Sequence, residues 1–368
     1  MKNTFLRLAF ILFAFHASAQ NAKVTIQQQT VKNELIQGFN YGQISHYAHR
    51  QTAGILGLTD SDYKIFNSVI PLAMRENVRC SGTVSKYQNI HEPGNGTHDN
   101  MIVNWSELYT SHNNFFARMN FAMKVFAKNR SWIFDQFNEI SPRSYIYDQV
   151  EIYHKTGGKT FAFTFNTDMP YVNWCTLDQS VASLKYVYEN TNVITVELGN
   201  EPYFDGWLFG SKAKEYEPKM DAYIQYLEQK AVPAIQGVVG KSIPIGIPIN
   251  NASTAQVHKY WTKKAIELYY RLTAKGIKAF LVPHIYTTGY DEASIRKGIS
   301  DELKGIDSSI EIRITEYNAD IKAGKTTQQG AFDYFNLFNK VASEYKQIRG
   351  TYDHCALDNR DMHYSFIK

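Results

Sequence analysis

The feature that most constrains the fold is the alternation of short apolar runs with amphipathic stretches along the whole chain. The apolar runs predict strands at 35–41, 77–83, 160–166, 195–198, 243–250, 279–286, 310–318 and 348–356. The stretches between them predict helices at 61–74, 148–156, 178–189, 213–239, 255–275, 292–304 and 328–345. A chain of 368 residues could hold two ordinary domains. Unbroken alternation without repeats or low-complexity linkers favours one α/β domain instead, a (β/α)8 TIM barrel.

Two of the predicted strands carry a glutamate to their C-terminal ends. Glu201 lies in the Gly-Asn-Glu-Pro motif at 199–202, and Glu316 lies in Thr-Glu-Tyr-Asn at 315–318. The two are 316 − 201 = 115 residues apart, which is three βα units at roughly 35 to 40 residues each. This spacing predicts strands four and seven and an acid/base pair at the barrel mouth. The alternatives are a buried ion pair for Glu201 and an exposed loop acid for Glu316.

These two motifs resemble the catalytic pair of retaining glycoside hydrolases of clan A, in which Asn-Glu closes strand four and a second glutamate closes strand seven. In motif style the chain is similar to families 39, 51 and 79. The resemblance covers most of the chain as a pattern and is specific only at 199–202 and 315–318. It implies an enzyme that hydrolyses O-glycosyl bonds with two carboxyl groups and without a cofactor or a metal.

The resemblance also suggests roles for the two glutamates and their neighbours. The side-chain amide of Asn200 is expected to hold the 2-hydroxyl of the sugar, which makes Glu201 the acid/base. Glu316 is then the nucleophile and must react as an anion. The Ile-Gln-Gly-Phe-Asn opening that ends in Asn40 looks like strand one of clan A, and Trp174 follows strand three. Asn40 and Trp174 are therefore expected to bind substrate.

Three further side chains are candidates for the same site. Arg79, at the end of strand two, would place a positive charge beneath the sugar site, or would form an ordinary structural ion pair. His284 and Tyr286 are two residues apart on strand six and should face the same lumen. In the resembling enzymes a tyrosine at this position donates a hydrogen bond to the nucleophile. The alternative for His284 is a buried core histidine, and Tyr286 could likewise be structural.

Strand five ends at Asn250 and Asn251. These side chains could bind sugar hydroxyls, but a loop that caps the next helix at Ser253 is an equally good interpretation.

Other reaction classes lack their sequence signatures. The sequence contains no His-Glu-x-x-His or Cys-x-x-Cys, and its 3 cysteines are too scattered for a zinc site or a disulfide framework. Neither a Gly-x-Ser-x-Gly elbow nor a nucleotide-binding glycine loop is present. The alternative left open is a carbohydrate-binding barrel that has lost turnover.

The N-terminus reads as an export signal. Residues 1–19 have a basic start, an apolar run and Ala-Ser-Ala before the expected cleavage site. Removal of Lys2 and Arg7 lowers the net charge from +4 to +2, which argues against a nucleic-acid partner. We therefore expect a secreted or periplasmic bacterial protein without a membrane span; its oligomeric state is not determined by these patterns.

The remaining segments suggest the domain limits and the substrate. Residues 20–34 are expected to form an accessory strand, and 35–368 the catalytic barrel. No eighth helix fits after strand eight, so we expect a barrel truncated at its C-terminus, with an incomplete accessory β element. The long insertion at 83–130 should shape the cleft, and an exported enzyme with an aromatic loop suits a plant or algal poly- or oligosaccharide.

Overall fold

A computed structural model describes residues 35–40, 63–64, 67–68, 70, 72–79, 146–171, 176–204, 206–210, 212–319 and 328–354. All of these residues belong to one compact unit, Lys32–Lys368. The predicted export signal (1–19), accessory strand (20–34), insertion (83–130) and C-terminal tail lie outside the described residues. The expectations for those segments stay predictions.

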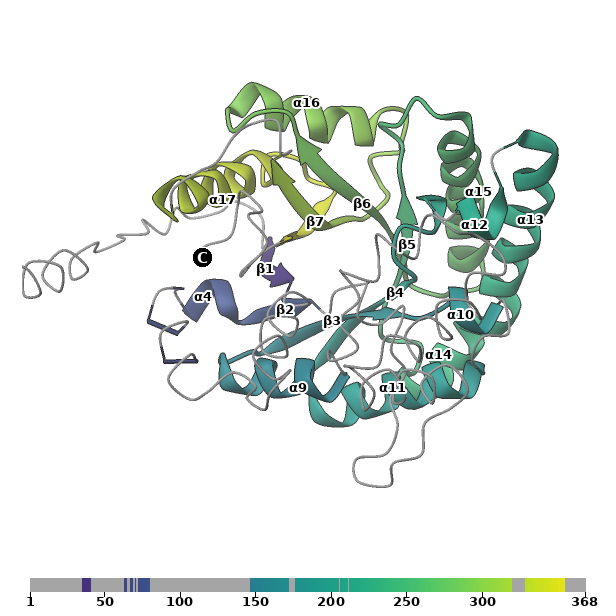
Figure 1. The fold of residues 1–368 in the computed structure, drawn as a ribbon, viewed down its shortest axis with the longest axis horizontal. Helices are drawn as coiled ribbons and strands as arrows, with labels where there is room; N and C mark the ends of the chain where they lie inside the picture. The colour runs from purple at the N-terminus through teal and green to yellow at the C-terminus, as the bar shows by residue number, and fades with distance from the viewer. Residues whose placement is uncertain are drawn as a thin grey trace, which may run out of the picture. The chain divides into compact units, whose positions relative to one another are not determined.

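Eight parallel strands close into a barrel in the order of the sequence, with β1 paired to β8 (Figure 1). The strands are β1 Ile36–Asn40, β2 Asn77–Arg79, β3 Thr160–Phe165, β4 Val193–Leu198, β5 Ile245–Ile249, β6 Ala279–Thr287, β7 Ile312–Ala319 and β8 Ile348–Asp353. The predicted (β/α)8 barrel is confirmed.

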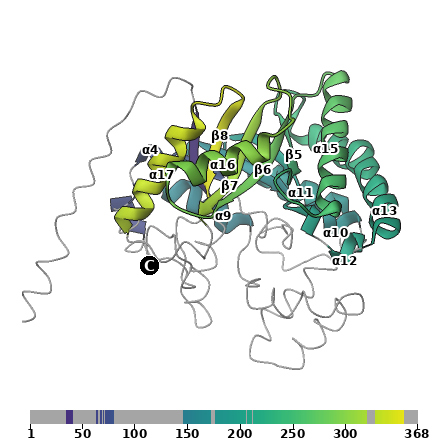
Figure 2. The same cartoon turned by 90° about the horizontal axis from the view of Figure 1, so that it is seen from above.

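Helices connect the strands and lie outside their ring (Figures 1 and 2). They are α4 Leu72–Arg75, α9 Ile146–Lys155, α10 Asp168–Tyr171, α11 Leu177–Asn190, α12 Gly206–Phe209, α13 Ala213–Tyr226, α14 Val232–Val239, α15 Gln256–Ala274, α16 Glu292–Leu303 and α17 Gln328–Ala342. Two short turns, η2 Pro202–Phe204 and η3 Leu227–Ala231, complete the set. None of the helices in the described part of the chain combines the length and apolarity needed to cross a membrane.

Aromatic packing between α17 and the barrel fixes which side chains face the lumen. The ring of Phe39 in β1 stacks on Phe335 at 5.3 Å, and the ring of Tyr317 in β7 stacks on Phe338 at 3.8 Å. Both strand residues therefore point outward to the helix. Because side chains alternate along a strand, their neighbours Asn40 and Glu316 point inward.

The strand register brings polar residues to one level near the C-terminal mouth. Asn40 is the pairing partner of Arg79 between β1 and β2, and His284 is the partner of Glu316 between β6 and β7. The register shifts between Leu281 and His284 in one pair and between Ile314 and Tyr317 in the next. Such irregularities re-aim side chains beside a functional site.

Several predicted element limits are wrong in detail. The stretch predicted as a helix at 213–239 is helical throughout, and a π-helical turn, η3, lies between α13 and α14. Pro233 lies in the first turn of α14 and has no amide hydrogen to donate to the preceding turn, which accounts for the local change in hydrogen bonding. The strand predicted at 348–356 ends at Asp353, and a short helix, α10, replaces part of the loop predicted after strand three.

Candidate active site

Glu201 sits on a tight turn just after β4. Gly199 has φ of 78° and Glu201 has φ of 47°, and Glu201 alone among the described non-glycine residues has a positive φ. A side chain at position 199 would put its Cβ 2.6 Å from Thr167 Oγ1. Glycine is therefore required there for both space and backbone conformation. The turn lifts the Glu201 side chain over the barrel mouth.

Glu316 extends from β7 into the same mouth, and its Oε1 atom is held from below. Arg79 Nη1 donates to this oxygen at 2.7 Å, and Asn40 Nδ2 donates at 3.3 Å. Both donors are buried. Asn40, which was expected to bind substrate, thus contacts the Glu316 carboxylate.

The other oxygen, Glu316 Oε2, faces a different set of donors. The Tyr286 hydroxyl donates to it at 3.1 Å. The Nδ1 atoms of His284 and His354 each lie 3.3 Å away. Tyr286 and His284 therefore meet at one carboxylate, as expected of two residues that share a face of strand six. A carboxylate surrounded by this many donors is strongly stabilised in its charged form.

Arg79 is itself anchored by a second buried acid, Glu197 in β4. Its Nη2 atom lies 2.7 Å from Glu197 Oε2, and its Nε atom donates to Oε1 at 3.0 Å. Thr164 and Thr315 add hydroxyl contacts to the same Oε2 atom at 3.4 and 3.3 Å. Arg79 is thus both a structural ion pair and the positive charge beneath the site, which joins the two interpretations of this residue.

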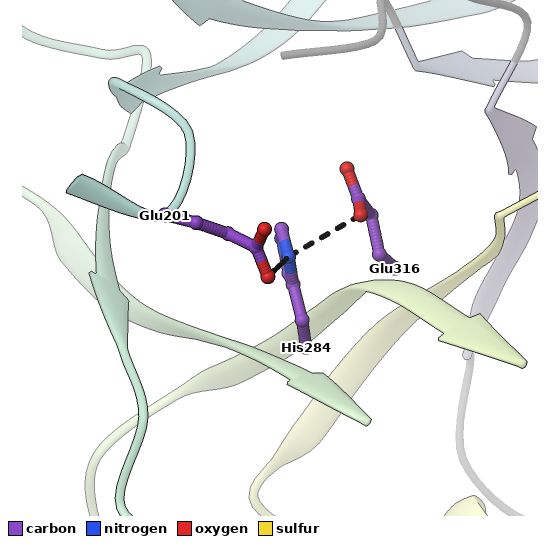
Figure 3. A group of neighbouring side chains, drawn as sticks. All are labelled: Glu201, His284 and Glu316. Carbon is purple, nitrogen blue, oxygen red and sulfur yellow. Dashed lines mark hydrogen bonds and ion pairs between the residues drawn. The ribbon is translucent and has the colours of Figure 1, made fainter. Parts of the chain in front are cut away.

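His284 lies between the two glutamates (Figure 3). Its Nδ1 atom is 2.9 Å from Glu201 Oε1 and 3.3 Å from Glu316 Oε2. One oxygen of each carboxylate and a His284 ring nitrogen all lie within 4.8 Å of one another. Among the described residues, the Glu201 carboxylate has one further hydrogen-bond partner, the Tyr203 hydroxyl at 3.4 Å. Its side chain is 25% exposed, against 5% for Glu316.

The charges of the site shift proton affinities in opposite directions. Burial alone would raise the pKa of Glu316, but the positive charges of His284, His354 and Arg79 outweigh it and hold that pKa well below the usual range. Burial alone would lower the pKa of His284, but Glu316 and Glu201 raise it overall. Glu316 is therefore an anion at neutral pH, and His284 favours its protonated form.

Glu201, His284 and Glu316 are the group in the described part of the chain whose ligand atoms could meet at one metal ion. The surrounding charge does not suit a cation. Arg79 lies 2.7 Å from Glu316 Oε1 and already neutralises this carboxylate, and its guanidinium would repel a divalent ion. The donor set fits a pair of acid/base groups better than a metal site.

Asn200 is oriented by the same guanidinium. Its Oδ1 atom accepts from Arg79 Nη2 at 3.3 Å. This contact turns the Nδ2 donor away from Arg79, and within the described residues Nδ2 has no acceptor. Trp174, the remaining predicted substrate-binding residue, lies outside the described residues.

Two residues of this network were not identified from the sequence. Glu197 is an acid inside the apolar run of β4, and a buried charge needs a partner, so its position was a usable signal. His354 directly follows β8, and its contact with Glu316 depends on where that strand ends. Asn251, in contrast, donates to the backbone oxygens of Glu302 and Lys304 at 2.9 and 2.8 Å. It serves the structure of the loop.

Fold and site together define a (β/α)8 barrel with two close carboxyl groups at the C-terminal mouth. No protein-family model matches the sequence, and no curated protein matches it significantly. Similar solved structures are glycoside hydrolases, with TM-scores below 0.5 for the three described next. At such values the likeness is not evidence of a shared activity, and function is inferred from the site.

An intracellular xylanase from Thermoanaerobacterium saccharolyticum is 11% identical, with a TM-score of 0.46 over 92% of this chain and 93% of its own. A glucosidase from Croceicoccus marinus is 12% identical, with a TM-score of 0.46 over 91% of this chain and 62% of its own. A GH39 β-xylosidase from Caulobacter crescentus is 13% identical, with a TM-score of 0.41 over 87% of this chain and 61% of its own.

Proposed function

We propose that this protein is a retaining glycoside hydrolase with Glu316 as nucleophile and Glu201 as acid/base. The observation that carries the proposal is the approach of one oxygen from each carboxylate to within 4.8 Å of the other. Retaining enzymes hold their carboxyl groups about 5 to 5.5 Å apart, whereas inverting enzymes leave about 6.5 to 9.5 Å for a water molecule. The separation favours direct attack by a carboxylate.

The unequal surroundings of the two carboxyl groups support the assignment of roles. Glu316 is buried, receives donors on both oxygens and has a pKa well below the usual range, as an anionic nucleophile requires. Glu201 is more exposed, and its carboxylate meets fewer donors among the described residues, which suits a group that exchanges a proton with substrate and water. The Nδ2 donor of Asn200, which has no acceptor among the described residues, is suited to the 2-hydroxyl of the bound sugar.

The reaction then has two displacement steps. Glu316 attacks the anomeric carbon while the bond to the leaving oxygen breaks and Glu201 gives that oxygen its proton. Water next attacks the same carbon, Glu201 accepts a proton from it, and the bond between the carbon and Glu316 breaks. Glu316 is released as a carboxylate, so the same two residues are ready for the next cycle.

We further propose an exported enzyme that acts on a plant or algal poly- or oligosaccharide. This part rests on the sequence of 1–19 and of the insertion at 83–130, both outside the described residues. Purified protein should be screened on aryl glycosides and on plant and algal polysaccharides, with the anomeric configuration of the product followed by NMR. Binding without turnover across the screen would favour the non-catalytic barrel.

The roles are tested by chemical rescue on an aryl glycoside with a good leaving group. Glu316→Ala should abolish turnover. Glu201→Ala should keep the first step, and added azide should restore turnover as a glycosyl azide of retained configuration. An azide product of inverted configuration from Glu201→Ala would mean that the roles are reversed. An inverted product from Glu316→Ala would support the assignment a second time.

A further inference from the structure

Phe204 is an exposed aromatic side chain beside the proposed acid/base. It ends the turn η2, and its backbone amide donates to Glu201 O at 2.9 Å. Its side chain is 56% exposed, the largest value for any large hydrophobic residue in the described part of the chain. Exposed aromatic residues are common singly on protein surfaces, and it is the position of this ring beside Glu201 that suggests a binding role.

The Phe204 ring is held in a defined orientation. Tyr203, which is buried, packs against it with ring centroids 4.8 Å apart. His258, at the start of α15, meets it edge to face at 4.8 Å and 86°. Tyr203 also contacts the Glu201 carboxylate through its hydroxyl at 3.4 Å. The exposed ring is therefore preorganised and coupled by one side chain to the acid/base.

A polar edge borders this apolar surface. His258 Nδ1 lies 2.7 Å from Ser253 Oγ and 3.4 Å from Asn250 Nδ2. When the Ser253 hydroxyl and the Asn250 amide donate to Nδ1, the hydrogen of the neutral ring lies on Nε2. No described residue partners Nε2. A flat apolar face beside a ring N–H that no described residue accepts from matches the two kinds of surface that a sugar ring presents, its C–H face and its hydroxyls.

We propose that Phe204 and His258 form a leaving-group subsite in which the sugar released by the first step stacks on the Phe204 ring. The inference rests on the proposed function and deepens it. The acid/base protonates the leaving oxygen, so the leaving group lies on the Glu201 side of the bond, where Phe204 is. The substrate class is then a glycoside whose leaving group is itself a sugar, and His258 Nε2 donates to one of its hydroxyls.

The contribution of this subsite can be measured by comparing two substrates that differ only in the leaving group. The substrates are a disaccharide of the sugar selected by the screen and the corresponding glycosyl fluoride, whose leaving group has no ring. Phe204→Ala should lower the ratio of kcat/KM for the disaccharide to that for the fluoride about tenfold, which corresponds to about 1.4 kcal/mol. Phe204→Tyr should retain most of the ratio. An unchanged ratio in Phe204→Ala would overturn the proposal.

Tyr270→Ala is the matched control. Tyr270 is also exposed, at 50%, and lies on the same helix as His258. The two are 270 − 258 = 12 residues apart, about 18 Å along the helix axis. This variant should leave the ratio unchanged. An equal fall in Tyr270→Ala would show that loss of any exposed aromatic ring weakens the enzyme, against a specific subsite.

A trapped intermediate separates failure of the subsite from failure of the proposed function. A 2-deoxy-2-fluoro glycosyl donor should form an ester on Glu316, detected by mass spectrometry. An acceptor sugar should reactivate this species, and Phe204→Ala should raise the acceptor concentration for half-maximal reactivation about tenfold. Normal dependence on acceptor in the variant overturns the subsite alone. No ester and no turnover in the unmodified protein overturn the proposed function and the subsite with it.

Discussion

Arg79 Nη2 lies 2.7 Å from Glu197 Oε2, and neither side chain exposes any surface to solvent. The same guanidinium reaches Glu316 Oε1 through Nη1, also at 2.7 Å. Glu197 therefore fixes one side of the group that orients the proposed nucleophile on the other side. Although Glu197 does not touch Glu316, the position of the Glu316 carboxylate depends on it.

Arg79→Met should destabilise the fold strongly, because two buried carboxylates lose their shared partner. Removal of one member of a buried ion pair typically costs about 3 to 5 kcal/mol. Urea unfolding at pH 7 measures the free energy of unfolding. The double variant Arg79→Met with Glu197→Met should recover part of the loss, since it removes one of the uncompensated charges. A loss below about 1 kcal/mol in Arg79→Met would contradict this account.

Tyr286→Phe should slow glycosyl transfer while leaving the fold intact. The hydroxyl donates to Glu316 Oε2 at 3.1 Å, and a hydrogen bond to a charged group is worth about 1.5 to 3 kcal/mol. We expect kcat/KM to fall roughly ten- to hundredfold, with little change in the midpoint of unfolding. Tyr270→Phe, at an exposed position on α15, is the control. A large fall in stability for Tyr286→Phe would indicate a structural role.

His354→Ala should move the acidic limb of the pH profile upward. The charged forms of His284, His354 and Arg79 hold the pKa of Glu316 well below 4.5 despite its burial. Glu316 stays anionic until the pH falls through that low pKa, so activity of the unmodified enzyme should persist below pH 4.5. Loss of the positive charge of His354 should raise the pKa of Glu316 and so move the acidic limb of the pH profile to higher pH. Glycosyl fluoride hydrolysis, which needs no acid, reports this limb.

The same lowered pKa makes a prediction about stability. Glu316 contributes stability that is present above the pKa of its unfolded form and is lost as pH falls through its folded pKa. The free energy of unfolding should therefore fall on acidification below about pH 4.5. Glu316→Gln should show a shallower fall over that range, because glutamine does not titrate. Parallel curves for the two proteins would rule out this contribution.

Gly199→Ala should be among the most harmful glycine substitutions. Its Cβ would lie 2.6 Å from Thr167 Oγ1, in addition to the cost of an alanine at φ of 78°. Gly276 offers a matched control, since its φ is 74° and nothing lies within 4 Å of an added Cβ. Both variants bear the left-handed cost of about 1 to 2 kcal/mol. Gly199→Ala should lose a further 1 to 3 kcal/mol from the clash, roughly, measured by urea unfolding.

The sequence predicted the features that depend on periodicity. Alternating runs predicted the barrel, and Glu201 and Glu316 could be assigned to the ends of strands four and seven, because parallel strands present their C-terminal ends at one mouth of a barrel. Asn40, Arg79 and His284 could be named on the same basis. Their partners could not be assigned, because a contact such as Asn40 with Glu316 depends on register and on the irregularities in β6, β7 and β8.

Features that depend on local geometry were not accessible in this way. Glu197 carries a signal, because it is an acid inside an apolar strand, but its partner Arg79 is set by packing across the barrel. His354 could be placed at Glu316 only once β8 was known to end at Asp353. The exposure of Phe204 follows from the direction of the turn η2, which the Asn-Glu-Pro motif does not specify. The sequence pattern predicts how far along its strand a residue lies. Its contacts depend on the three-dimensional packing of the strands and loops.

The left-handed backbone at Glu201 means that the residue needed for catalysis is not the residue that would give the most stable fold. An L-residue with a Cβ is strained at φ of 47°, and glycine is not. Glu201→Gly should therefore be more stable than Glu201→Ala by about 1 kcal/mol, the reverse of the order in ordinary helices and strands. Random mutagenesis selected only for heat resistance should then enrich glycine at this position and yield robust but inactive barrels. Selection for both heat resistance and activity should keep Glu201 and enrich stabilising substitutions at other positions.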